Sequence, residues 1–193
     1  MIEDQHPLLK QVQQCNLCAD ILEPRPVVVV KPAAKLLIVG QAPGKKVHQT
    51  GIPWNDPSGD RLRQWLNISR ETFYQSPHIA ILPAGFCYPG KGKSGDLPPP
   101  PICFHTWHHK LKQLMPEISL TLLIGQYAQG HYLGNNKGKT LTETVKRFAQ
   151  YLPQGLLPLP HPSPRNILWF KRNPWFENEV IPALRDATNY VDR

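Results

Sequence analysis

Four short apolar runs, separated by stretches with helical spacing, are the feature that most constrains the fold of this chain. The runs read KLLIVG at 35–40, HIAILPA at 78–84, LTLLIG at 120–125 and GLLPLP at 155–160. A short run that is apolar at nearly every position is typical of a strand buried on both faces. Alternation of such strands with helices predicts an α/β fold, a three-layer α/β/α sandwich around a central four-stranded, mostly parallel sheet.

The segments between these runs carry the spacing of amphipathic helices. We expect a helix at 7–22, which would contain Cys15 and Cys18, and a helix at 58–69 with Ser58 as its N-cap. The other expected elements are helices at 103–115, from 126, at 141–152 and at 173–191, and either an edge strand or an extended lead-in at 27–30.

Three unusual loops follow the predicted strands. They are GQAPG at 40–44, a loop rich in Gly, Lys and Pro at 86–102, and HPSP at 161–164. Because ligands bind outside the carboxyl ends of the strands in open parallel sheets, we expect all three loops to meet at one ligand-binding edge. GQAPG has neither the spacing of a P-loop nor that of a dinucleotide-binding GxGxxG, so both of those sites are excluded.

The charge balance bears on the partner of such a site. Lys and Arg number 22 against 14 Asp and Glu, a net charge of +8, which favours a polyanion because cationic contacts to phosphates release counterions. A solvated basic surface on an ordinary enzyme is the alternative.

The opening MIEDQHPLLK is unlike a signal segment, and no run of about 18 apolar residues occurs, so we expect a cytoplasmic protein without a membrane span. No composition break divides residues 1–193, so one domain is expected.

GQAPG and the late PHPSPRN together resemble the uracil-DNA glycosylase superfamily, in which an early G-[EQ]-x-P-[GY] loop and a late HPS loop close on a flipped-out base. The sequence is most similar to the iron–sulfur branch, family 4, whose first loop reads GEAPGxxEDxxGxPF. Here GQAPGKKVHQTGIPW at 40–54 fits that frame without a gap. An early CxxC, two later cysteines and LLIGQYAQGHYLG extend the resemblance over nearly the whole chain.

The resemblance implies a DNA glycosylase that flips out uracil or a related damaged base and hydrolyses its N-glycosidic bond in base excision repair. His161 would stabilise the leaving base, and Trp54 would stack on it. The implied pocket-lining residues are Gly40, Gln41, Ala42, Pro43 and Gly44. The implied DNA contacts are Lys45, Lys46, Ser163 and Arg165. Ordinary packing of the His and Trp, and ordinary solvated charge, are the alternatives.

The acidic residues of the family's first loop are missing. Gln41 replaces its Glu, and Val47 and His48 replace its acidic pair. Asp56 is then the candidate for activating a water, and a turn role before Pro57 is the alternative.

The amide that reads uracil in the family is also missing. Its position after the second strand holds ILPAGF, with Pro83 or a neighbour in its place, and Asn55 is the candidate substitute from the first loop. Loss of a buried side chain that forms two hydrogen bonds with the base weakens the discrimination between uracil and other bases. The expected target is therefore uracil or another damaged base. A catalytically weakened or inactive protein of the same fold that binds DNA or a damaged base is the alternative function, and a hydrolase of free nucleobases or nucleotides is a third. The sequence leaves the oligomeric state open, with a monomer as the expectation.

The four cysteines are Cys15, Cys18, Cys87 and Cys103. Four thiolates suit a [4Fe–4S] cluster or a structural zinc, and their order along the chain, as in the family, favours the cluster. His105, His108 and His109 offer nitrogen ligands to zinc instead, and four free thiols without metal are the third possibility. Any metal here would be structural and would join the N-terminal segment to a loop on the DNA side.

Overall fold

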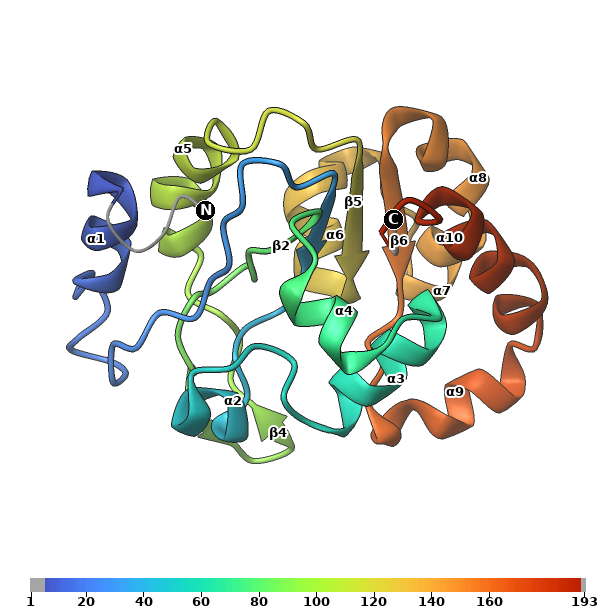
Figure 1. Cartoon of the computed structure of the whole chain (residues 1–193). Coiled ribbons are helices and arrows are strands. Elements are labelled where there is room, and N and C mark those ends of the chain that lie inside the picture. The colour runs from blue at the N-terminus through green and yellow to red at the C-terminus, as the bar shows by residue number, and fades with distance from the viewer. Residues whose placement is uncertain (1–5, 192–193) are drawn as a thin grey trace.

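The computed structural model describes residues 6–191 and has a central sheet of four strands, all parallel (Figure 1). The strands are β1 (Leu36–Val39), β2 (Ile79–Ile81), β5 (Leu120–Ile124) and β6 (Leu156–Leu159). Their order across the sheet is β2-β1-β5-β6. Each predicted apolar run forms one strand, and helices flank the sheet, so the prediction of an α/β/α sandwich is confirmed.

Two apolar cores lie on the two faces of the sheet. Successive residues of β1 point to opposite faces, so Leu36 and Ile38 belong to one core and Leu37 and Val39 to the other. The first core is covered by α3 (Pro57–Leu66), α4 (Arg70–Gln75), α7 (Leu141–Lys146), the π-helical η5 (Phe176–Val180) and α10 (Ile181–Ala187). The second is covered by α1 (Pro7–Gln13), the π-helical η1 (Phe104–His108), α5 (His109–Lys112) and α6 (Gly125–Leu133).

The N-terminal helix is shorter than predicted. We expected a helix at 7–22, but α1 ends at Gln13, and Cys15 and Cys18 lie in the turns that follow. The apolar spacing was misleading there, because Leu17 and Ile21 are 52% and 71% exposed instead of facing a core.

Several short elements were not predicted. They are α2 (Lys45–Thr50) inside the first loop, α4, the antiparallel hairpin of β3 (Lys91–Gly92) and β4 (Gly95–Asp96), and α9 (Ile167–Arg172). Short helical turns occupy η2 (Gly134–Asn136), η3 (Leu152–Gln154) and η4 (Pro164–Asn166). The helix expected at 141–152 is divided at Arg147 into α7 and α8 (Phe148–Tyr151). The N-cap of α3 is Asp56 rather than Ser58, because the Asp56 side chain accepts from the Gly59 N–H at 2.8 Å.

Replacement of Phe176 by Ala tests the first core. Phe176 is fully buried, and its ring centroid lies 5.0 Å from that of Trp65. The change should lower the free energy of unfolding by about 3–5 kcal/mol, because it removes buried area and leaves a cavity. Urea denaturation measures the loss. The exposed Glu179 in the same helical segment gives the matched control, and an equal effect of Glu179→Ala would contradict this account.

Candidate functional site

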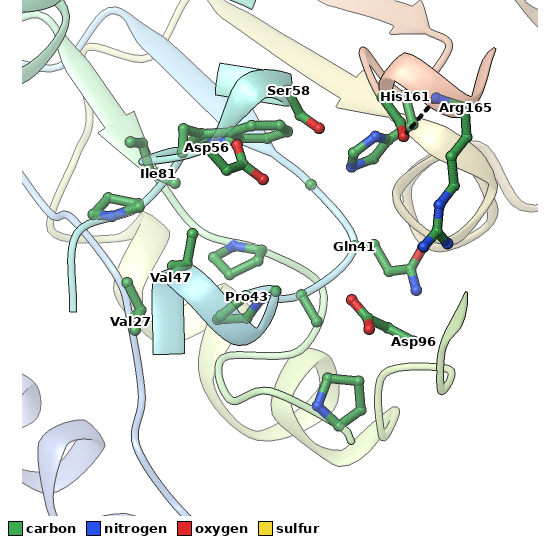
Figure 2. Close-up of a pocket in the computed structure, with 18 residues that line it drawn as sticks. Val27, Gln41, Pro43, Val47, Asp56, Ser58, Ile81, Asp96, His161 and Arg165 are labelled. Carbon is green, nitrogen blue, oxygen red and sulfur yellow. Dashed lines mark hydrogen bonds between the residues drawn. The ribbon is translucent and has the colours of Figure 1, made fainter. Parts of the chain in front are cut away.

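The carboxyl ends of β1, β2 and β6 meet at one edge of the sheet and enclose a cavity of about 390 Å³ (Figure 2). The loop after β1 is fixed to the segment after β2 by two backbone hydrogen bonds. The Ala84 N–H donates to Gly40 O and the Gly85 N–H donates to Gln41 O, both at 2.9 Å. The cavity is therefore part of the sheet edge itself, and its position follows from strand pairing.

Trp54 forms one wall of the cavity and has an unusual backbone. Its φ is 57°, a left-handed conformation that costs a residue with a Cβ about 1–2 kcal/mol. Its carbonyl oxygen accepts from Arg63 Nη1 at 3.2 Å, and a Cβ on Gly59 would overlap that oxygen. A Cβ on Gly40 would lie 3.0 Å from the indole ring, so the ring needs glycine beneath it. The surrounding residues thus hold the indole in one position.

His161 lies beside Trp54, with ring centroids 5.8 Å apart and planes tilted by 32°. It follows β6 on a loop that is fixed at two points: Asn166 Nδ2 donates to His161 O at 2.8 Å, and Arg61 Nη1 donates to Ser163 O at 3.2 Å. Burial lowers the pKa of His161, and the carboxylates of Asp56 and Asp96 offset part of that effect. The imidazole is therefore neutral at pH 7, and a neutral ring can donate a hydrogen bond without bringing a charge into the cavity.

Most of the residues singled out from the sequence line this cavity. They are Gly40, Gln41, Ala42, Pro43, Gly44, Trp54, Asp56, Pro83, His161, Ser163 and Arg165. Asn55 does not line the cavity, because its Oδ1 accepts from Arg70 Nη2 at 2.7 Å. Lys45 and Lys46 are exposed on α2, outside the lining.

Asp56 has a structural role in addition to its place in the cavity wall. It caps α3 through its Oδ1, as the alternative role in the turn before Pro57 anticipated, and its side chain also lines the cavity. One carboxylate oxygen is engaged with the helix, and the side chain is thereby fixed in orientation.

Asp96 is the ionisable residue of the described cavity lining that sequence reasoning missed, and the apolar Val27, Val47 and Ile81 were missed as well. Asp96 comes from the β3–β4 hairpin, inside the segment that we expected to be an irregular loop. Tyr88 Oη donates to Asp96 Oδ1 at 3.4 Å, and Asp96 Oδ2 lies 3.8 Å from the position of a Cβ on Gly44. Figure 2 shows Asp96, Gln41 and Arg165 on the same side of the cavity. The signal in the sequence was the turn KGKSGD, whose glycines permit a tight hairpin.

The four cysteines line a second, small pocket, although they come from distant parts of the chain. Its other walls are apolar: Leu22, Pro24, Pro26, Phe86 and Pro100. Burial raises the pKa of the Cys87 thiol to about 11, even though the Arg25 N–H donates to its Sγ at 3.3 Å. Burial also raises the pKa of Cys103, and an N–H from Phe86 opposes that shift.

Four thiols are the ligand number of an iron–sulfur cluster and of a structural zinc. Two of these sulfurs, those of Cys87 and Cys103, accept backbone N–H groups in an apolar pocket, as the sulfurs of iron–sulfur clusters do. Within residues 6–191, no group of three or more His, Cys, Asp or Glu side chains is arranged to hold one metal ion.

The fold and the cavity define an α/β protein with an indole and a histidine side by side in a cavity at the strand ends. The model of the uracil DNA glycosylase superfamily matches residues 27–185. The chain therefore belongs to the uracil DNA glycosylase superfamily, whose members act on DNA. Among the described helices, none has the length and apolar character needed to cross a membrane.

The protonation of His161 can be followed directly. We expect its pKa to lie below the usual histidine value of about 6.5, and Asp96→Asn should lower it further, because that carboxylate stabilises the imidazolium. Proton NMR of the imidazole across a pH series measures both values. Asp186→Asn, on the exposed surface of α10, is the charge-matched control. A pKa above 6.5, or equal effects of the two substitutions, would refute this electrostatic account.

Proposed function

We propose that this protein is a monofunctional DNA glycosylase that binds an extruded damaged base in the cavity and hydrolyses its N-glycosidic bond. The observation that carries the proposal is that Trp54 and a neutral His161 lie side by side in one cavity at the sheet edge. Superfamily membership over most of the chain supports the same chemistry. The base is uracil or another damaged base.

The reaction places charge where this cavity can stabilise it. As the C1′–N bond breaks, its electron pair leaves with the base, and positive charge develops on the deoxyribose. Trp54 stacks on the base, and the neutral imidazole of His161 donates a hydrogen bond to the base oxygen that becomes negative. A donor fixed in place beforehand stabilises the departing anion without reorganisation during the reaction.

A carboxylate is needed to orient the water that attacks C1′, and we assign this role to Asp96. Gln41 cannot act as a carboxylate. Asp56 and Asp96 each have one oxygen engaged, but Asp56 Oδ1 caps α3 at 2.8 Å, whereas the contact of Asp96 Oδ1 with Tyr88 Oη is longer, at 3.4 Å. Asp96 lines the cavity, and its charge reaches His161. The water adds to C1′, its proton passes to the carboxylate and then to the departing base, and the products are an abasic site and the free base.

Basic side chains beside the cavity suit the DNA backbone. Lys45 and Lys46 lie on α2, Lys91 and Lys93 lie on the hairpin, and Arg165 follows His161; all five are exposed. The hairpin adjoins both other segments, because a Cβ on Gly95 would lie 3.2 Å from Arg165 Nη1 and Asp96 approaches Gly44. These cations can bind phosphates on either side of an extruded nucleotide.

A damaged-base-binding protein without catalysis is the second candidate. Two features favour it: Gln41 stands where the family has its glutamate, and Pro83 stands where the family has its reading amide. Such a protein would keep the cavity and its cations and lack the water activation.

Base excision can be measured on labelled oligonucleotides that carry uracil or other damaged bases, followed by alkaline cleavage at abasic sites. His161→Ala and Asp96→Asn should each lower the rate by about 10² or more, because they remove leaving-group stabilisation and water activation. DNA affinity should change little in Asp96→Asn. Glu179→Ala, an exposed position on η5 outside the cavity lining, should keep full activity.

The outcomes separate the candidates. Tight, salt-dependent binding of damaged DNA without cleavage of any base supports the binding protein. Cleavage that survives in His161→Ala contradicts the proposed mechanism. A loss in Asp56→Asn but not in Asp96→Asn would transfer the water-activating role to Asp56.

The four cysteines are proposed to hold a structural [4Fe–4S] cluster. Cys15 and Cys18 would bind it from the turns after α1, and Cys87 and Cys103 from the two ends of the loop that contains the hairpin. The bound cluster would supply a covalent link between these segments and no chemistry at the cavity. Zinc, or no metal, remains the alternative.

Anaerobic purification tests the cofactor. The protein should be brown, with a broad absorption band near about 400 nm and matching amounts of iron and sulfide. Cys15→Ser and Cys103→Ser should remove the colour and lower the urea midpoint, because the loop loses its covalent anchor. Zinc in place of iron and sulfide would support the alternative metal, and a colourless, metal-free protein of unchanged stability would contradict both.

A further inference from the structure

The cavity has an apolar end, and this end bears on which base it accepts. We propose, resting on the proposed function, that the preferred base carries an apolar substituent on the edge that pairs in a duplex, as N3-alkylated pyrimidines do. The side chains at that end form no hydrogen bonds, and much of its backbone is already bonded.

Val27, Val47 and Ile81 form the apolar end, and each is almost fully buried. Figure 2 shows them together on the side of the cavity away from His161 and Arg165. Pro43 and Pro83 complete this part of the lining, and they have no N–H to donate. None of these five side chains can form a hydrogen bond with a base.

The backbone at this end is largely engaged elsewhere. The Ile81 N–H donates to Val29 O, the Ile81 carbonyl accepts from the Val29 N–H, and the Val27 N–H donates to Phe86 O. The Pro83 carbonyl accepts from His108 Nε2 at 2.8 Å, and the Val47 carbonyl accepts the Gly51 N–H that ends α2. The backbone of Ile81, the N–H of Val27 and the carbonyls of Val47 and Pro83 are therefore not free to bind a base.

The position of His161 fixes which edge of the base meets this end. In a pyrimidine the O2 atom lies next to the glycosidic nitrogen, so a base whose O2 faces His161 directs its N3 and O4 edge away from the sugar. That edge then faces Val27, Val47 and Ile81. The N3–H and O4 of uracil would find no side-chain partner there and none among the engaged backbone groups, which is costly, whereas a methyl group on N3 removes the donor and fills apolar space.

The matched probes are single-stranded oligonucleotides with one uracil or one N3-methyluracil. Single strands remove the difference in base pairing between the two. A 2′-fluoroarabino sugar at that nucleotide destabilises the cationic sugar and prevents cleavage, so fluorescence anisotropy measures binding alone. The N3-methyluracil strand should bind at least about tenfold more tightly than the uracil strand. Equal binding, or tighter binding of uracil, overturns the inference.

Val47 offers a nearly isosteric test of the apolar end. Val47→Thr adds a hydroxyl at similar volume and should reduce the preference for N3-methyluracil several-fold, because uracil gains a partner. Val47→Asn should do so more strongly, and circular dichroism verifies that both variants fold. Gln49→Thr, on the exposed side of the same helix, should leave the preference unchanged. A preference that persists in both folded Val47 variants contradicts the assignment of this end to the base edge.

Cleavage assays with ordinary deoxyribose separate the two proposals. Binding preference without cleavage of either strand overturns the glycosylase and leaves the inferred pocket selectivity standing. Cleavage of both strands with a uracil preference supports the glycosylase and overturns the inference.

Discussion

Parallel pairing of β1 with its neighbours is the constraint on which the rest of the structure depends. With the pairing of β6 to β5, it places the carboxyl ends of β1, β2 and β6 at one edge, although the loops after β1 and β6 lie more than a hundred residues apart in the chain. Burial of the sheet on both faces fixes the register, because a shift by one residue would exchange the side chains of the two cores. The hydrogen bonds from Ala84 and Gly85 then extend this order into the first loop.

Backbone strain at Trp54 is balanced by its surroundings. A left-handed conformation is unusual for a bulky residue, and here Arg63 binds its carbonyl while Gly40 and Gly59 leave room for its ring and oxygen. The glycine in the first loop is thus required by the packing of an aromatic ring. The result is a rigid indole facing His161, which is useful for binding a flat base because little freedom is lost when the base enters.

The cavity combines a polar end, with His161, Asp96 and Arg165, and an apolar end near Ile81. The carboxylates of this lining come from two elements, Asp56 at the start of α3 and Asp96 from the β3–β4 hairpin. Val27, Val47 and Ile81 form the apolar end. Because buried polar atoms are costly without partners, we expect this apolar end also to restrict the ligand.

The sequence alone determined the four strands, the ligand-binding edge and most of the cavity lining, because apolar runs and strand-end loops are local patterns. It also predicted that Trp54 and His161 share one site, and their ring centroids lie 5.8 Å apart in the structure. It misplaced the end of the first helix and the cap of α3, where competing local signals were close in strength. Only the tertiary structure brought Asp96 to the cavity, Asn55 to Arg70 and four cysteines to one pocket. These contacts join segments distant in sequence, and their formation depends on packing that no local pattern records.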